Sequence, residues 1–236
     1  MLHAVPSRHL FDITPSGFWG ILVGWLLAVQ PALPAAAPAA ASPPRFPVTG
    51  RVSYGPFHHD YPATDIFGRC GARVVAPADG VVLEVARRDR WDPATDRGAD
   101  RGGRSFSLRG ADGVRYYGSH LWTVRRGLRA GSTVGAGDTL GRVGHSGDAR
   151  GIACHLHFGL SPVCRGTGDW RVRRGTVPPY RFLRSWQRGG HLDPAPAVRR
   201  WRATHGCRGS PPDADGWIRQ RGGRCWGVRL RWPLGQ

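Results

Sequence analysis

Residues 73–86 read RVVAPADGVVLEVA, with β-branched runs on either side of a Pro-Ala-Asp-Gly turn. Runs of this kind around such a turn are typical of a β-hairpin, which we predict here. Residues 106–117 (FSLRGADGVRYY) repeat the pattern around Ala-Asp-Gly and predict a second hairpin. Glycines then punctuate a Val/Leu pattern over residues 128–143, and residues 154–160 (CHLHFGL) predict a further strand. Successive short strands indicate a β-rich domain.

The composition agrees with many turns and short strands. The chain of 236 residues contains 35 Gly and 20 Pro, which argues against long helices. Its length suits one domain of ordinary size with additional terminal segments. Between the two hairpins, residues 87–104 are charged, Gly-rich and aperiodic, so we expect a loop of low order there. The fold class that we predict is mainly β.

The N-terminal segment has the features of an export signal. Residues 17–29 (GFWGILVGWLLAV) form an uncharged apolar run that follows Arg8 and precedes an Ala/Pro-rich stretch. Ala39 and Ala41 are small residues that suit a signal cleavage site, and the run is short for a membrane span of about 20 residues. We therefore expect residues 1–42 to be a cleaved signal peptide with its linker, or alternatively a retained N-terminal anchor. Both alternatives place the domain outside the cytoplasm.

The C-terminal part divides into an extension and a tail. Residues 180–187 (YRFLRSWQ) predict a short helix, with apolar side chains near one face and two glycines soon after its end. The domains that we expect are residues 48–165 as the main domain, 166–202 as an extension with this helix, and 203–236 as an Arg/Trp/Gly-rich tail. The tail has no periodicity, so its fold is not assigned.

The chain has five cysteines and no C-x-x-C pair, so a thiolate metal site is not indicated. Cysteines of an exported protein can form disulfides. Cys154 and Cys164 bracket a short strand-and-turn segment, and we expect them to pair. The odd number of cysteines leaves at least one thiol unpaired within the chain.

Arginine provides all of the positive charge. The chain has no lysine, and its 34 basic residues against 16 acidic ones give a net charge of +18. Such a charge attracts polyanions, including anionic wall polymers. Together with the ten tryptophans, it also suggests a nucleic-acid-binding protein as a possible class. No recognition-helix pattern or RNP-like strand supports that class, and export argues against a genomic target. We therefore expect no specific nucleic-acid partner.

Histidine and aspartate residues form the main chemical constellation. His58 and His59 precede Asp65, and a Pro-containing turn separates the two histidines from the aspartate. His155 and His157 lie in the strand predicted over residues 154–160. Residues two apart in a strand point to the same face. One histidine and one aspartate from the loop, together with this pair, supply three metal ligands and one spare base. That composition is typical of a catalytic zinc site with an open fourth position.

Two further histidines differ in context. His120 follows the strand predicted at the end of residues 106–117, within the sequence YYGSHL, and adds another imidazole to the same domain. His145 lies in a Gly-rich turn (GHSG), so we interpret it as a turn residue.

The order H…D, then Y-x-x-H-L, then G-x-x-x-H-L-H-F resembles the signature of the lysostaphin-type (LytM-like) peptidoglycan zinc metalloendopeptidases. The resemblance extends over residues 50–165, where GARVVAPADGVV and GSTVGAGDTLGRVGHSG also resemble segments of this family. It implies an antiparallel β-sheet core of the barrel-sandwich-hybrid kind, with a short C-terminal helix and an irregular tail. It also implies a secreted enzyme that uses Zn²⁺ to hydrolyse peptide bonds of bacterial cell-wall peptidoglycan.

The resemblance also implies roles for individual residues. His59, Asp65 and His157 become the zinc ligands, and His120 and His155 become the catalytic imidazoles. The family commonly places its first His and Asp four residues apart, whereas His59 and Asp65 are six apart. This difference leaves open whether His58 or His59 is the ligand, although we favour His59. The roles of the two catalytic imidazoles and the identity of the bond that is cut also stay open.

Two other interpretations concern binding proteins. The segments APADGVV and VGAGDTLG also resemble biotinyl and lipoyl carrier domains, which need an attachment lysine; the absence of lysine excludes a carrier of this kind. A non-enzymatic peptidoglycan-binding or regulatory homologue stays as the alternative. In either case the expected partner is a peptidoglycan peptide, and a membrane is a partner only if the N-terminal segment is retained.

Overall fold

The computed structural model describes residues 42–56, 58, 60–164 and 169–207. The expected export segment, Cys225 and the tail beyond residue 207 lie outside the described residues. Among the residues that are described, no helix has the length and apolar character needed to cross a membrane.

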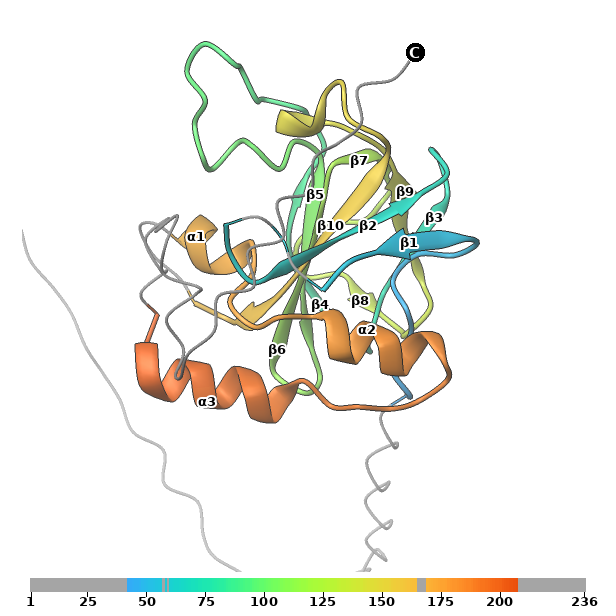
Figure 1. Ribbon diagram of the computed structural model, residues 1–236, viewed down its shortest axis with the longest axis vertical. Coiled ribbons are helices and arrows are strands. Elements are labelled where there is room, and N and C mark those ends of the chain that lie inside the picture. Colours follow the sequence, from blue (N-terminus) through green and yellow to red (C-terminus); the bar gives the residue numbers. More distant parts are fainter. Residues whose placement is uncertain (1–41, 57, 59, 165–168, 208–236) are drawn as a thin grey trace, which may run out of the picture. The chain divides into compact units, whose positions relative to one another are not determined.

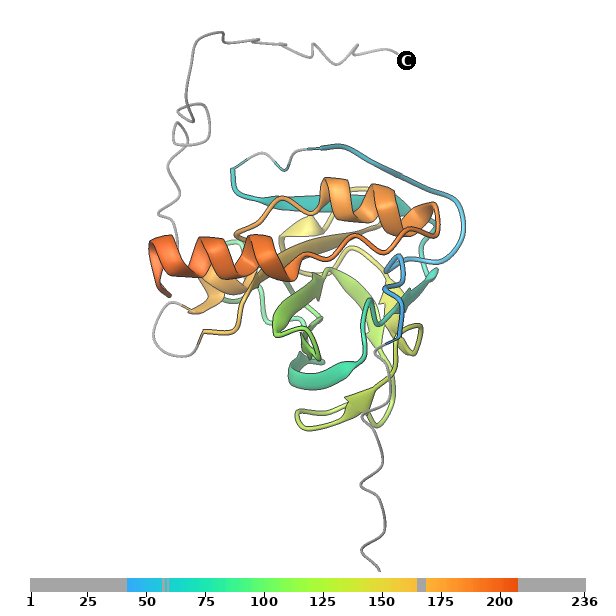
Figure 2. The same ribbon diagram turned by 90° about the horizontal axis from the view of Figure 1, so that it is seen from below.

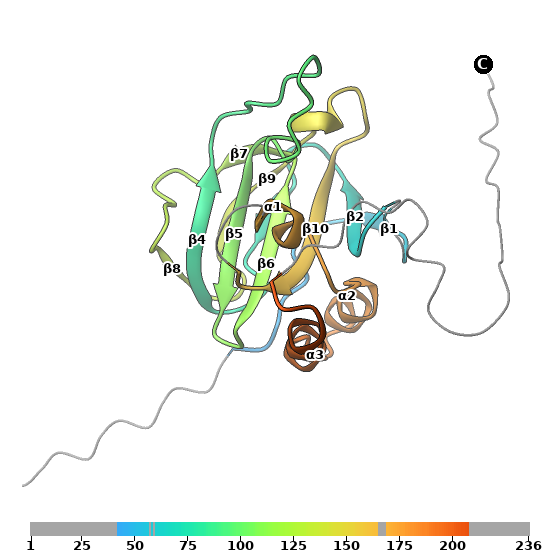
Figure 3. The same cartoon turned by 90° about the vertical axis from the view of Figure 1, so that its left-hand side faces the viewer.

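Seven strands form the larger sheet. They are β1 (Val52–Tyr54), β2 (Ala63–Gly68), β4 (Gly80–Ala86), β5 (Ser105–Gly110), β6 (Val114–Ser119), β8 (Thr133–Val134) and β10 (His155–Pro162). Their order is β1-β2-β10-β6-β5-β4-β8, with every neighbouring pair antiparallel (Figures 1 and 3). Strands β6 and β10 are buried along their whole length, which explains their apolar and aromatic residues. The centre of this sheet is therefore the core of the domain.

Three strands form the smaller sheet, in the order β3-β9-β7. They are β3 (Arg73–Val75), β9 (Thr139–Val143) and β7 (Leu121–Val124), again antiparallel. The described strands form two open antiparallel sheets and no closed barrel. The prediction of a mainly β fold with an antiparallel core is confirmed.

One of the two predicted hairpins is present. Strands β5 and β6 pair directly across the Ala-Asp-Gly turn, which confirms the hairpin over residues 106–117. The hairpin predicted over residues 73–86 is wrong, because β3 pairs with β9 whereas β4 pairs with β5 and β8. After β3 the chain continues along the β9 side, where Ala76 N donates to Asp138 O. The turn therefore connects the two sheets and does not fold one strand back on the other.

The helices follow β10 in sequence. They are α1 (Asp169–Arg173), α2 (Tyr180–Gln187) and α3 (Ala195–His205); a short 3₁₀ helix, η1 (Gly147–Ala149), precedes β10. Helix α2 has the bounds predicted from sequence, and Trp186 packs its ring on Tyr116 of β6 and Phe158 of β10. Helices α2 and α3 lie next to each other (Figure 2). The sequence analysis missed α1 and α3, the latter of which begins directly after Pro194.

The disulfides differ from the expected pairing. Cys70 pairs with Cys154, and Cys164 pairs with Cys207, so the predicted Cys154–Cys164 bond is wrong. Cys154 and Cys164 lie beyond opposite ends of the eight-residue strand β10. A strand of that length spans about 26 Å, whereas a disulfide needs Cα atoms within about 7 Å. The second bond ties the end of α3 to the end of β10.

Residues 87–104 contain no helix or strand, as expected of a loop. Side chains nevertheless hold the loop against its surroundings, contrary to the expected low order. Asp89 accepts hydrogen bonds from Gly147 N at 3.0 Å and from Arg150 Nε at 3.1 Å. Asp96 pairs with Arg101 within the loop. These contacts fix the loop beside η1, and so beside the histidine cluster described next.

Candidate active site

Strand register brings the main site residues together. In the pairing of β10 with β2, His157 lies opposite Asp65 and His155 lies opposite Phe67. His155 and His157 share one face because they are two residues apart. His157 Nδ1 is 2.9 Å from Asp65 Oδ1, although 92 positions separate these residues in sequence. The strand pairing therefore places an imidazole directly against a carboxylate.

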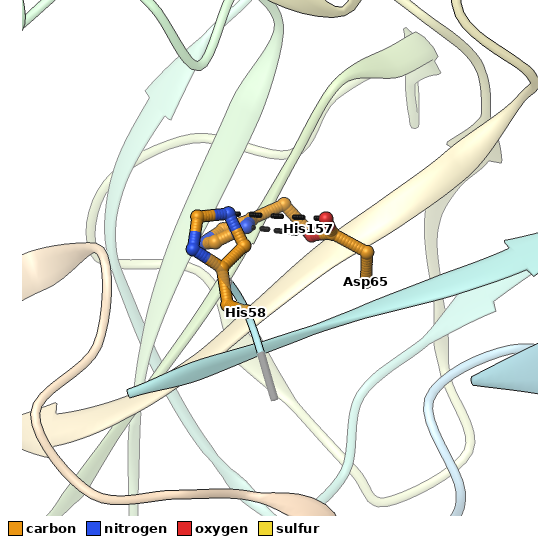
Figure 4. Close-up of side chains that lie close together, drawn as sticks. All are labelled: His58, Asp65 and His157. Atoms are coloured by element: carbon orange, nitrogen blue, oxygen red, sulfur yellow. Dashed lines mark hydrogen bonds and ion pairs between the residues drawn. The ribbon is translucent and has the colours of Figure 1, made fainter. Parts of the chain in front are cut away.

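His58 completes a group that could hold a metal ion. Its Nε2 is 3.8 Å from Asp65 Oδ2, and Figure 4 shows the rings of His58 and His157 close together, both facing the carboxylate of Asp65. One ligand atom from each of His58, Asp65 and His157 lies within 4.8 Å of the others. Zinc bonds of 2.0–2.1 Å at tetrahedral angles separate neighbouring ligand atoms by about 3.3 Å. The observed 2.9 and 3.8 Å lie close to that separation.

The second nitrogen of each imidazole also fits metal binding. His58 Nδ1 is 2.9 Å from Asp60 Oδ1. His157 Nε2 donates to the main-chain carbonyl of Arg174 at 3.0 Å, since a carbonyl only accepts. Metal-binding histidines almost always donate their other N–H to a carboxylate or carbonyl in this way. The nitrogen that faces Asp65 in each ring would then bind a metal; in His157 this nitrogen donates a proton to Asp65, which a bound metal would replace.

His120 lies between β6 and β7 in a strained conformation. Its φ of 64° is in the left-handed region, which non-glycine residues adopt mainly where the surroundings impose it. Its backbone N donates to Gly102 O at 3.0 Å, and its Nδ1 donates to Ser146 O at 2.8 Å. Burial, followed by the charges of His157 and His155, lowers the pKa of His120 to about 3. This imidazole is therefore neutral near pH 7.

His155 has the same arrangement of ring nitrogens. Its Nδ1 donates to Ala153 O at 2.8 Å, so in the neutral ring Nε2 carries the lone pair. Its ring centroid lies 4.9 Å from that of His120. Both imidazoles are thus oriented by backbone carbonyls, and each keeps one nitrogen as a proton acceptor.

Asp65 stays ionised in these surroundings. Burial raises the pKa of the carboxyl group, but the hydrogen bond from His157 and the charges of His157, His58 and His155 outweigh burial and hold the pKa well below its usual range. A permanently charged carboxylate beside two imidazoles is the donor set that a divalent ion such as zinc requires.

The structure brings together most of the site residues predicted from sequence. His58, Asp65, His120, His155 and His157 line one cavity of about 210 Å³. His59 lies outside the described residues, so its role and the choice between it and His58 stay predictions. His145 is exposed and does not line this cavity, in agreement with its interpretation as a turn residue.

Comparison with known proteins finds a family that resembles part of the chain. Residues 59–167 match Peptidase family M23. The chain is also similar to a curated protein of Bacillus subtilis (strain 168) named L-Ala–D-Glu endopeptidase. The two are 30% identical over 130 residues, which cover 53% of this chain and 35% of that protein. The chain thus spans about a third of the length of this relative.

Solved structures of two peptidases resemble the chain as well. The catalytic domain of the antimicrobial peptidase lysostaphin from Staphylococcus simulans is 23% identical, with a TM-score of 0.41 and coverage of 61% of this chain and 92% of that one. A zinc-containing peptidase from Vibrio cholerae is 19% identical, with a TM-score of 0.41 and coverage of 58% and 39%.

Part of the cavity wall comes from beyond the residues that match family M23. Trp170, Arg173 and Arg174 line the cavity and follow residue 167. The backbone of Arg174 crosses directly over β10 at Gly159, where an added Cβ would lie 2.2 Å from Arg174 O. Glycine in β10 therefore lets this carbonyl reach His157. No local pattern in the sequence pointed to Arg174, which is one of many arginines.

Two further cavity residues were missed. Tyr61 follows the predicted His58–Asp60 segment, and its hydroxyl is 3.4 Å from His157 Nε2. Asp148 of η1 lies 3.9 Å from His120 Nδ1, and burial raises its pKa. The position of Tyr61 next to the predicted histidines was a usable signal, whereas Asp148 is brought in only by the fold.

Proposed function

We propose that this chain is an exported zinc metalloendopeptidase that hydrolyses peptide bonds of bacterial cell-wall peptidoglycan. The observation that carries the proposal is the convergence of His58, Asp65 and His157 beside the imidazoles of His120 and His155 in one cavity. The match of residues 59–167 to peptidase family M23 supports it, as does the similarity to a protein named L-Ala–D-Glu endopeptidase.

The proposed metal ligands are Asp65, His157 and one histidine of the His58–His59 pair. A zinc ion held there would supply Lewis acidity, which acidifies water and polarises a peptide carbonyl. Asp60 and the carbonyl of Arg174 orient the ligand imidazoles through their second nitrogens. Three protein ligands of this kind leave a position open to water and substrate.

The proposed role of His120 and His155 is proton transfer. Backbone carbonyls hold Nδ1–H of His120 and His155, so each Nε2 can accept a proton from the attacking water. Once protonated, the same nitrogen can donate to the amine that leaves. The low pKa of His120 keeps it unprotonated before attack and makes its conjugate acid a strong donor.

Export and substrate attraction are part of the proposal. The apolar run at residues 17–29 supports export by a signal peptide, which N-terminal sequencing of the secreted protein would test. The net charge of +18 favours anionic wall polymers near the peptide substrate.

Digestion of purified peptidoglycan tests the function directly. The full chain, loaded with zinc, is incubated with the wall material, and mass spectrometry identifies the products. We expect cleaved peptides that are absent after prolonged chelation and return when zinc is added. Cleavage that survives chelation would contradict the metal-dependent mechanism. Binding to the wall without any release of peptides would instead favour the non-enzymatic alternative.

A further inference from the structure

Three arginines line the cavity, and they differ in their ionic partners. Arg101 pairs with Asp96, and Arg173 pairs with Glu84 at 3.0 Å. Among the described residues, no carboxylate oxygen lies within 4.0 Å of the Arg174 guanidinium. The internal positions that are not described, 57, 59 and 165–168, contain no acidic residue. Within the part of the chain that the structure describes, Arg174 is thus the cavity arginine that forms no ion pair, although the more distant carboxylate of Asp60 also acts on its charge.

Aromatic contacts fix the position of this guanidinium. It lies 3.8 Å from the ring centroid of Tyr61 and 5.3 Å from that of Trp170. The ring of Tyr61 in turn packs 4.3 Å from the ring of His58. Arg174 Nε is buried without a hydrogen-bond partner among the described residues. The charge is therefore held beside the proposed metal ligands, with donor groups that the protein does not use.

A half-buried cation without an ionic partner costs free energy that a matching anion recovers. Burial accordingly lowers the pKa of Arg174. A guanidinium stacked on an aromatic face keeps its N–H edge available, and that edge matches the two oxygens of a carboxylate. A carboxamide offers one oxygen and no charge, so the same edge binds it more weakly.

Resting on the proposed peptidase function, we propose that Arg174 binds a carboxylate of the substrate peptide next to the bond that is cut. The site then selects peptides with a free carboxylate over otherwise identical peptides in which that group is a carboxamide. Because Arg174 lies beyond residue 167, this selectivity comes from the C-terminal extension, whereas Asp65, His157 and the imidazoles of His120 and His155 lie within the residues that match family M23.

Two synthetic peptides and three variants test the proposal. The peptides span the bond cleaved in the digestion experiment and differ only in carrying a carboxylate or a carboxamide beside it. For the zinc-loaded full chain, we expect kcat/KM to be about tenfold higher for the carboxylate, the size of one charge-assisted hydrogen bond. In Arg174→Gln this ratio should fall close to one, and in Arg174→Lys it should be intermediate.

Arg171→Gln is the matched control, because it removes the same charge from an exposed side chain that does not line the cavity. We expect it to keep the parent ratio. A ratio near one in the parent chain, or a full ratio in Arg174→Gln, would overturn the role of Arg174. If the parent chain cleaves neither peptide, the proposed function itself fails. If Arg174→Gln does not fold, the ratios of the parent chain and of Arg174→Lys decide.

Discussion

The two walls of the cavity are built in different ways. One wall is made of strands: register places Asp65 of β2 against His157 of β10, with His155 on the same face. The other wall is made of α1 and the loop over residues 87–104, which bring arginines and Trp170. The strand wall carries the groups that can bind a metal and move protons, whereas the other wall carries charge that can select a substrate. In the proposals made above, chemistry and selectivity thus have separate structural origins.

The largest effect is expected on the strand wall. His157→Ala removes a proposed ligand, so we expect loss of bound zinc and a fall in kcat/KM of about 10⁴-fold or more. Metal analysis and peptide cleavage measure the two effects. His145→Ala is the control, since that histidine is exposed outside the cavity. A His157→Ala protein that is as rich in zinc as the parent would contradict the ligand assignment.

A different result is expected for His155, which lies two residues before His157 on the same face of β10. His155→Ala should keep zinc, because its proposed role is proton transfer and not metal binding. The loss of a general acid–base group lowers turnover by about 10²–10⁴-fold. Metal content and turnover are measured on the same samples. Loss of zinc in this variant would show that His155 is a ligand and that the two roles have been assigned wrongly.

On the wall made of α1 and the loop over residues 87–104, a substitution that frees α1 should lower stability more than it changes metal binding. Arg115 of β6 is buried and pairs with Asp169, the first residue of α1, at 2.8 Å. Asp169→Ala leaves this cation without its partner, and we expect the free energy of unfolding to fall by about 3 kcal/mol. Zinc content should not change, since no proposed ligand is altered.

Chemical denaturation checks this expectation. The double variant Arg115→Met with Asp169→Leu is the control, because replacing both partners by apolar residues removes the unpaired charge. It should be more stable than Asp169→Ala. Equal stability of Asp169→Ala and the parent chain would mean that this ion pair does not hold α1.

The smallest effect is expected where the loop is attached to η1. Burial raises the pKa of Asp89, but hydrogen bonds from Gly147, Arg150 and Trp91 outweigh it, so the pKa lies below the ordinary 3.8. A carboxyl group with a lowered folded-state pKa stabilises the fold above the unfolded-state pKa, and this contribution is lost as the pH falls through the folded value. We expect Asp89→Asn to cost about 1 kcal/mol at pH 7 and less below about pH 4.

Thermal denaturation at pH 7 and at pH 3 measures this difference. The parent chain and Asp89→Asn should differ clearly at pH 7 and approach each other at pH 3. A difference of the same size at both values would show that the charge of Asp89 does not hold the loop.

Local patterns in the sequence predicted the parts of the fold that depend on neighbouring residues. The Ala-Asp-Gly turn predicted the β5–β6 hairpin, and apolar spacing predicted α2. The alternation of side chains in a strand predicted that His155 and His157 share a face. These features need no knowledge of distant contacts.

The parts that failed depend on distant contacts. The Pro-Ala-Asp-Gly turn was misread because β3 is paired by β9, some 65 positions later in the chain. The disulfides follow strand direction, which places Cys154 beside Cys70 and far from Cys164. Arg174 reaches the cavity only because Gly159 lets the backbone cross β10, a packing relation with no local signal.

The central claim is that Asp65 and His157, together with a histidine of the His58–His59 pair, bind one zinc ion. Anomalous diffraction at the zinc absorption edge, from crystals of the zinc-loaded full chain, tests it most directly. We predict one strong peak within about 2.2 Å of a carboxylate oxygen of Asp65, of His157 Nδ1 and of one imidazole of that pair. A peak elsewhere on the molecule, or none in active crystals, would contradict the account.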